Sequence, residues 1–145
     1  MEKIYITQDV AKEAKELLEK EYTVVIGKNL TEDELCEIIG EYDGIITRSQ
    51  TRITKKVIEA ADNLKVIGRA GVGIDGIDLE AATRRGITVV NTPESNTIAA
   101  CEHAIALMLS VTRCIPQAHQ SIQEGRWDRK SFTGIQLLDK TVGIN

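Results

Sequence analysis

The chain has 145 residues, of which 42% are hydrophobic and 28% are charged, a composition typical of a globular protein with a real core. A net charge of −4, an aromatic content of 3% and the lack of any apolar run of about 18 residues argue against nucleic-acid binding and against a membrane span. The widely spaced cysteines Cys36, Cys101 and Cys114 suit reduced thiols in a cytoplasm better than a disulfide framework or a zinc site.

Strand-like runs alternate with helical patterns over residues 1–92. Strands are predicted over residues 3–7, 22–26, 44–47, 64–70 and 87–90. Helices are predicted over residues 9–20, from a capping box of Thr31 and Glu34 onward, over 54–61, and from Asp78 to about Arg85, where Gly86 ends the helix. Helical crossovers between strands require a parallel sheet, so we predict a doubly wound α/β domain. Among the possible strand orders we choose the flavodoxin-like one, although one sequence does not reveal the order.

The pattern changes after Pro93. Residues 97–111 are apolar on nearly every helical face, which predicts a helix buried within a domain or between subunits. Pro116 can open another helix that Gly125 closes, and an irregular connection follows. Thr141–Ile144 then reads as a strand. We therefore expect residues 93–145 to hold interdomain or dimerisation helices and the first strand of a truncated Rossmann domain.

Three loops at the carboxyl ends of predicted strands favour an anionic ligand, because open α/β sheets bind ligands at that edge. Arg48 offers a planar fork of donors after the third strand. Gly71 and Gly73 allow backbone N–H groups to approach a ligand after the fourth strand. Asn96 lies at the start of the apolar helix, whose N–H groups also favour anions. Each loop alone equally suits solvated arginines and turn glycines, whereas the three together favour a small ligand with two acidic ends.

The run from Gly71 to Gly76 fits the G-x-G-x-x-G pattern of dinucleotide sites and follows a strand. The next helix starts only at Asp78 and is short, whereas a dinucleotide site has a helix directly after the glycines. The following strand ends in Val90-Asn91, where a ribose site needs Asp or Glu about 20 residues on. We therefore do not interpret this run as the main cofactor site.

Several stretches resemble one known family. They are the runs at residues 48–54 (RSQTRIT), 68–75 (GRAGVGID), 78–82 (DLEAA), 86–93 (GITVVNTP) and 125–130 (GRWDRK). Together they resemble the phosphoglycerate dehydrogenases, a branch of the NAD-dependent D-2-hydroxyacid dehydrogenases. The resemblance implies an enzyme that oxidises 3-phospho-D-glycerate to 3-phosphohydroxypyruvate with NAD, in serine biosynthesis. Relatives of the glyoxylate, hydroxypyruvate or lactate type remain alternatives.

The same resemblance assigns roles to individual residues. Arg48 and Ser49 match residues that hold the substrate's phosphate. The backbone around Gly71, Val72 and Gly73 matches the loop that grips its carboxylate, and Val72 also matches a contact of the cofactor's nicotinamide end. Asn96 matches a residue of the same cleft. The helix over 97–111 matches one that forms a homodimer.

The chain departs from the family pattern at its end. In the family, the strand matching Thr141–Ile144 leads into the cofactor's glycine fingerprint, whereas here only Asn145 follows. The family's catalytic Arg, Glu and His, and the helix that returns to complete the substrate domain, have no counterpart in these residues. We therefore expect the chain alone to be inactive, without catalytic residues of its own and without tight NAD binding.

Two other classes of function are weighed against the enzyme fragment. A standalone anion-binding domain is one, and its best version is a phosphoacceptor receiver. A receiver needs Asp after the third strand, where this chain has Arg48, so it is disfavoured. The other is a structural role in which the apolar helix pairs two chains, and that role is compatible with the enzyme fragment.

Overall fold

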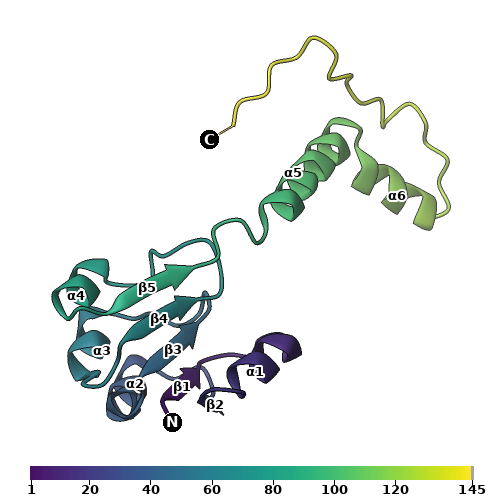
Figure 1. The fold of residues 1–145 in the computed structure, drawn as a ribbon. Helices are drawn as coiled ribbons and strands as arrows, with labels where there is room; N and C mark the ends of the chain where they lie inside the picture. Colours follow the sequence, from purple (N-terminus) through teal and green to yellow (C-terminus); the bar gives the residue numbers. More distant parts are fainter. Residues whose placement is uncertain (145) are drawn as a thin grey trace. The chain divides into compact units, whose positions relative to one another are not determined.

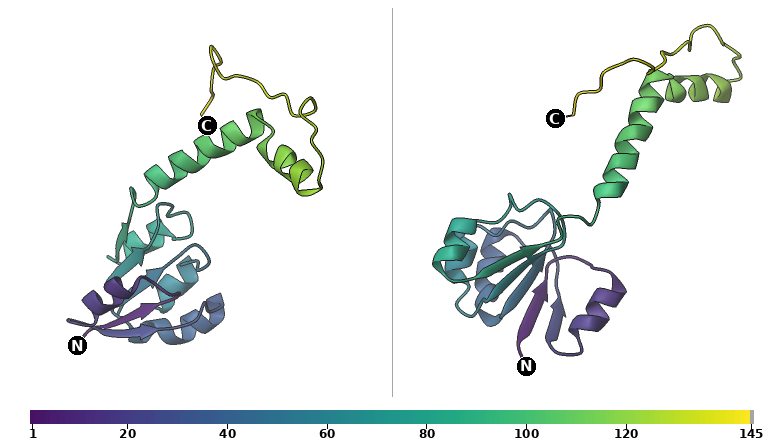
Figure 2. Two further views of the ribbon diagram at one scale, coloured as in Figure 1. Left: turned by 90° about the vertical axis from the view of Figure 1, so that its right-hand side faces the viewer. Right: turned by 45° about the horizontal axis from the view of Figure 1, so that its top comes forward.

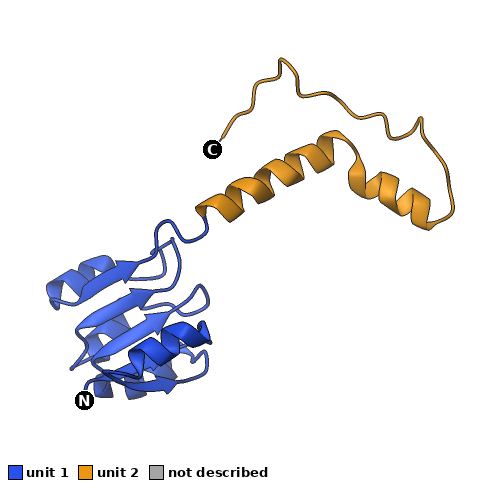
Figure 3. Ribbon diagram, turned by 45° about the vertical axis from the view of Figure 1, so that its right-hand side comes forward, with its two compact units in different colours: residues 1–96 blue, residues 97–145 orange. Residues whose placement is uncertain are grey.

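The computed structural model describes residues 1–144, which form two compact units. The first unit covers Met1–Asn96 and the second begins at Thr97 (Figure 3). The division therefore falls four residues after Thr92, the predicted boundary. Each unit is described by itself.

A five-stranded parallel sheet forms the centre of the first unit (Figure 1). The strand order β2-β1-β3-β4-β5 is the flavodoxin-like one, so the predicted fold class is confirmed. The strands are β1 (Lys3–Ile6), β2 (Thr23–Ile26), β3 (Gly44–Thr47), β4 (Val66–Arg69) and β5 (Thr88–Asn91). The helical elements are α1 (Lys12–Leu18), α2 (Glu32–Ile38), the short 3-10 helix η1 (Ile39–Glu41), α3 (Lys55–Ala60) and α4 (Leu79–Arg84).

The helices cover the two faces of the sheet unequally. The chain first moves from β1 to β2, and then back past β1 to β3, β4 and β5. Because parallel crossovers are right-handed, this reversal puts α1 on one face and α2, α3 and α4 on the other. Figure 2 shows this arrangement, with α1 on the opposite face from α3 and α4.

The core lies between the sheet and the α2–α4 layer. Tyr5, Ile45 and Ile67 are in register on neighbouring strands and are buried there. The next residues along the strands, Ile46, Gly68 and Val90, are also in register and face the other way, as the period of two requires. Val90 is 50% exposed, so α1 covers only the β1 side of that face.

Local signals in the sequence act as predicted at the helix ends. Glu34 N–H donates to Oγ1 of Thr31, and the carboxylate of Glu34 accepts from the Thr31 N–H at 2.8 Å, which completes the capping box. Oδ1 of Asp78 accepts from the N–H of Ala81 at 2.9 Å at the start of α4. Gly86 has φ +68°, the left-handed conformation that ends a helix at little steric cost.

The second unit contains α5 (Thr97–Thr112) and α6 (Ile115–Gln123), followed by irregular chain. Pro116 lies in the first turn of α6, and Gly125, with φ +74°, follows its end, as predicted. Neither helix alone is long and apolar enough to cross a membrane, although the two together meet the length and composition criteria across a 64° bend.

One prediction for this unit is wrong, and another is tested only in part. The helix α5, predicted to be buried within a domain or between subunits, has no buried residue in the described chain, which packs little besides α6 against it, so burial between subunits stays a prediction. Thr141–Ile144, predicted as the first strand of a Rossmann domain, is not a strand. A strand exists only with a neighbour to pair with, and no other strand lies within residues 97–144.

Opposite charges meet at the amino ends of the strands. The Lys3 N–H donates to Oδ2 of Asp43 at 2.9 Å, and the Lys65 ammonium lies 3.0 Å from Oδ1. These contacts, in that order of importance, hold the pKa of Asp43 below its ordinary value of 3.8. The Lys65 ammonium also donates to Glu2 at 2.7 Å, and the two carboxylates raise the pKa of Lys65 to about 12.

The lowered pKa of Asp43 makes stability depend on pH. Its carboxylate stabilises the fold above the pKa of the unfolded chain, and this contribution is lost as pH falls through the lower folded pKa. We expect Asp43→Asn to flatten the decrease of the unfolding free energy below about pH 4, measured by urea denaturation across pH. Asp62→Asn is the comparison variant, because it also neutralises one carboxylate, which is 84% exposed and lies 3.7 Å from Arg85 in a surface ion pair. An equal decrease in Asp43→Asn and the unmodified chain would contradict this account.

Candidate functional site

A cleft of about 790 Å³ lies at the carboxyl ends of the strands in the first unit. Segments that follow β1, β3 and β5 line it, together with residues 68–70 at the end of β4. The sheet reverses its strand order between β1 and β3, so the loops after these strands leave toward opposite faces. Such a reversal is where open α/β sheets bind ligands. The cleft is lined by Asp9, Val10, Ala11, Ala14, Leu18, Ile46, Arg48, Gly68, Arg69, Ala70, Val90, Asn91, Thr92 and Ser95.

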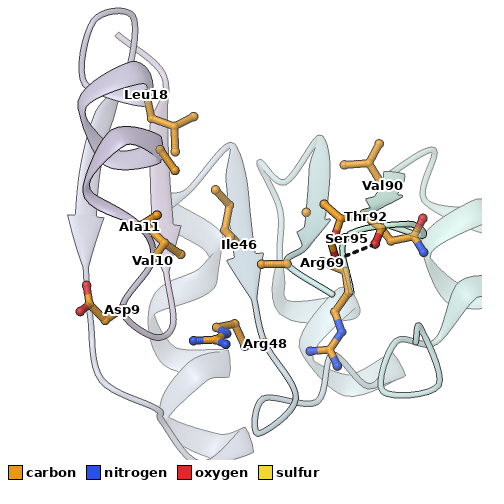
Figure 4. A pocket seen from close by; sticks show the side chains of 14 residues that line it. Asp9, Val10, Ala11, Leu18, Ile46, Arg48, Arg69, Val90, Thr92 and Ser95 are labelled. Atoms are coloured by element: carbon orange, nitrogen blue, oxygen red, sulfur yellow. Dashed lines mark hydrogen bonds between the residues drawn. The ribbon is translucent and has the colours of Figure 1, made fainter. Parts of the chain in front are cut away.

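Charged and apolar side chains occupy different parts of the cleft. Figure 4 shows the charged groups of Asp9, Arg48 and Arg69 at one end, and Leu18 and other aliphatic side chains at the other. Within residues 1–144, neither arginine forms an ion pair. Two uncompensated guanidinium groups beside a single carboxylate favour a ligand with negative charge.

The loops that form this edge are tied together by hydrogen bonds. Ile53, after β3, donates its N–H to the carbonyl of Gly76 at 2.8 Å and accepts from the N–H of Asp78 at 2.9 Å. Ile53 is fully buried, so the β3 and β4 loops share an apolar anchor. The hydroxyl of Thr51 also donates to the side chain of Asn29, after β2, at 2.7 Å. These bonds restrict the motion of the loop that carries Arg48.

The glycine loop after β4 presents free backbone donors beside the cleft. Within the described residues, the N–H groups of Val72 and Gly73 donate no hydrogen bond. A Cβ on Gly73 would lie 3.2 Å from Oδ2 of Asp75, so a larger residue would crowd that side chain. Unpaired N–H groups in successive residues are the arrangement that proteins use to bind a carboxylate or phosphate.

The structure brings only some of the predicted site residues into the cleft wall. Arg48 lines it directly. Ser49, the next residue, is exposed and lies outside the lining. The loop of Gly71, Val72 and Gly73 also lies outside the lining, and Val72 is 41% exposed. Asn96 is exposed at the end of the first unit, and Ser95 takes the place in the lining instead.

Two charged residues that line the cleft are not among the predicted site residues. Arg69 is the last residue of β4, and Asp9 follows β1. The rule that ligands lie at the carboxyl ends of strands points to both of them. Arg69 falls inside the predicted strand 64–70, where no ligand contact is expected. Asp9 is the first residue of the predicted helix 9–20, whereas α1 begins at Lys12.

The Gly71–Gly76 run lacks the surroundings of a dinucleotide fingerprint. After Gly71–Gly76 the chain makes a backbone bridge at Ile77, and α4 starts only at Leu79 and has six residues. No helix N-terminus therefore follows the glycines to receive a pyrophosphate, and β5 ends in Asn91 rather than in an acidic residue.

Comparison with known proteins identifies the family. Residues 4–133 match the family described as D-isomer specific 2-hydroxyacid dehydrogenase, catalytic domain, and the chain belongs to that family. D-3-phosphoglycerate dehydrogenase of Archaeoglobus fulgidus is 48% identical over 143 residues, 98% of this chain and 27% of that protein. The enzyme of the same name from Synechocystis sp. is 46% identical over 144 residues, 99% of this chain and 26% of that protein.

A solved structure extends the comparison to the fold. NAD+-bound 3-phosphoglycerate dehydrogenase of Entamoeba histolytica aligns with a TM-score of 0.69 at 34% identity, over 77% of this chain and 39% of that chain. Relatives of this protein thus include an NAD-binding dehydrogenase. The chain spans about a quarter of the length of the two curated relatives named above.

Proposed function

We propose that this chain is the substrate-binding part of an NAD-dependent dehydrogenase that oxidises 3-phospho-D-glycerate to 3-phosphohydroxypyruvate in serine biosynthesis. The observation that carries the proposal is the cleft at the strand reversal, with Arg48 and Arg69 at one end, where neither forms an ion pair within residues 1–144. Two curated relatives that match nearly the whole chain carry the name of this enzyme. The three cysteines are free, as in a cytoplasmic enzyme.

The substrate's two acidic ends match two kinds of donor. We assign the phosphate to the guanidinium of Arg48 with the hydroxyl of Ser49, which would turn inward from its exposed position. We assign the carboxylate to the free N–H groups of Val72 and Gly73, with Asn96 at the rim. Val72 then lies between substrate and cofactor, and its exposed apolar side chain suits the nicotinamide ring.

Oxidation of the hydroxyl also needs a hydride acceptor and a base. NAD, bound by residues outside this chain, would supply the acceptor. No histidine lines the cleft described here, so a base to take the hydroxyl proton would also come from elsewhere in the enzyme. The half-covered sheet face around Val90 suits the family's returning helix as its cover.

Arg48 provides the first test. Arg48→Met should weaken binding of 3-phosphoglycerate roughly ten- to hundredfold, because a charge-assisted hydrogen bond is worth about 1.5–3 kcal/mol. Isothermal titration calorimetry measures the change. Arg52→Met, which removes a nearby arginine that does not line the cleft, is the matched control and should bind as the unmodified chain does. Equal affinity in the two variants would exclude Arg48 as the phosphate ligand.

Binding of non-phosphorylated acids distinguishes the proposed substrate, 3-phosphoglycerate, from the alternative substrates. The unmodified chain should bind 3-phosphoglycerate more tightly than D-lactate or glyoxylate, and Arg48→Met should reduce that preference, because only the phosphorylated acid uses the guanidinium. Competition titrations with each acid give the ratios. A preference for D-lactate would favour the lactate-type alternative instead.

If the base and the cofactor site lie outside this chain, the chain should bind 3-phosphoglycerate without oxidising it. The chain with 3-phosphoglycerate and NAD should produce no NADH absorbance, and NAD alone should show no tight binding in calorimetry. NADH formation at a rate proportional to chain concentration would show that the base and cofactor site lie within these residues.

A standalone anion-binding domain would behave differently, since it would bind inorganic phosphate as well as 3-phosphoglycerate.

We further propose that α5 forms a homodimer contact. Its exposed apolar side chains include Ile98, Ile105, Leu107, Leu109 and Val111. An apolar surface of this kind on a 16-residue helix is a strong driving force for association. Sedimentation should therefore show a dimer that Ile105→Glu dissociates, whereas Leu17→Glu, at an exposed leucine of α1, leaves it intact. A monomeric unmodified chain would refute this contact.

A further inference from the structure

Three consecutive carbonyl groups of the glycine loop accept hydrogen bonds from residues at the ends of β4 and β5. The main-chain N–H of Thr92 donates to the carbonyl of Gly71 at 3.1 Å. Nδ2 of Asn91 donates to the carbonyl of Val72 at 2.8 Å, and Nε of Arg69 donates to the carbonyl of Gly73 at 2.9 Å. Arg69 and Asn91 are paired in register on β4 and β5, so their side chains leave the sheet on one face at one level. Three consecutive peptide groups are therefore fixed by the ends of two strands.

This arrangement determines where the loop's N–H groups point. In a trans peptide the C=O of one residue and the N–H of the next point in opposite directions. The loop contains no cis peptide bond. Since the carbonyls of Gly71 and Val72 face their donors at the end of β5, the N–H groups of Val72 and Gly73 face away from β5. They are the groups that donate no hydrogen bond within residues 1–144.

We propose that Asn91 is a positioning residue that orients the N–H groups of Val72 and Gly73 toward the substrate's carboxylate. This inference rests on the proposed function and adds a role for Asn91, which lines the cleft and acts on the substrate's carboxylate through its bond to the loop. Asn91 is suited to the role because an amide nitrogen can donate to a carbonyl whereas a carboxylate cannot. Without the bond to Val72, the Val72–Gly73 peptide is free to rotate, and the two N–H groups no longer converge.

The test compares two asparagines that make the same kind of bond at opposite ends of the sheet. Asn91→Leu keeps the size of the side chain and removes the donor. The matched control is Asn63→Leu, because Nδ2 of Asn63 donates to the carbonyl of Gly40 at 2.7 Å, away from the cleft. Both variants lose one side-chain bond to a backbone carbonyl, so any general loss of stability is shared.

The first measurement needs no ligand. The ¹H–¹⁵N heteronuclear NOE of the Val72 and Gly73 amides should fall in Asn91→Leu and stay unchanged in Asn63→Leu, because only the first variant frees the loop. Unchanged NOE values in Asn91→Leu would overturn the inference, whatever the chain binds.

The second measurement adds 3-phosphoglycerate. The Val72 and Gly73 amide resonances of the unmodified chain should shift on titration, and the dissociation constant should rise about three- to tenfold in Asn91→Leu only. Equal affinity in Asn91→Leu and the unmodified chain would also overturn the positioning role. Lack of any shift in the unmodified chain would instead refute the proposed function, while the NOE comparison still decides whether Asn91 holds the loop.

Discussion

The reversal of strand order between β1 and β3 is the constraint on which the rest of the first unit depends. Right-handed crossovers translate that reversal into helices on opposite faces, with α1 alone on one of them. The loops after β1 and β3 must then separate, and the space between them is the cleft that Asp9 and Arg48 line. The position of the candidate site thus follows from topology, before any side chain is considered.

The loops around the cleft are held in place by hydrogen bonds as well as by side-chain packing. The bridge between Ile53 and Ile77 joins the β3 loop to the β4 loop, and Asn91 and Thr92 join the glycine loop to the end of β5. A site ordered before the ligand arrives loses less conformational entropy on binding. The connected loops therefore give the candidate site a wall that is ordered before any ligand binds.

Charge is used differently at the two ends of the sheet. At the amino ends, the Lys65 ammonium lies between the carboxylates of Glu2 and Asp43 and pairs with both. At the carboxyl ends, Arg48 and Arg69 have no ion-pair partner in the described part of the chain. The first arrangement stabilises the fold, whereas the second leaves positive charge available to a ligand.

The sequence by itself determined the features that depend on near neighbours: the strands and helices of the first unit, the capping box at Thr31, the helix end at Gly86 and the family. Tertiary structure decided what depends on residues distant in sequence. It placed Arg69 and Asp9 in the cleft and left Ser49 outside its wall. It also left α5 without buried residues and Thr141–Ile144 without strand structure, although both patterns are apolar. Burial and strand pairing are properties of two surfaces in contact, and a sequence pattern describes only one of them.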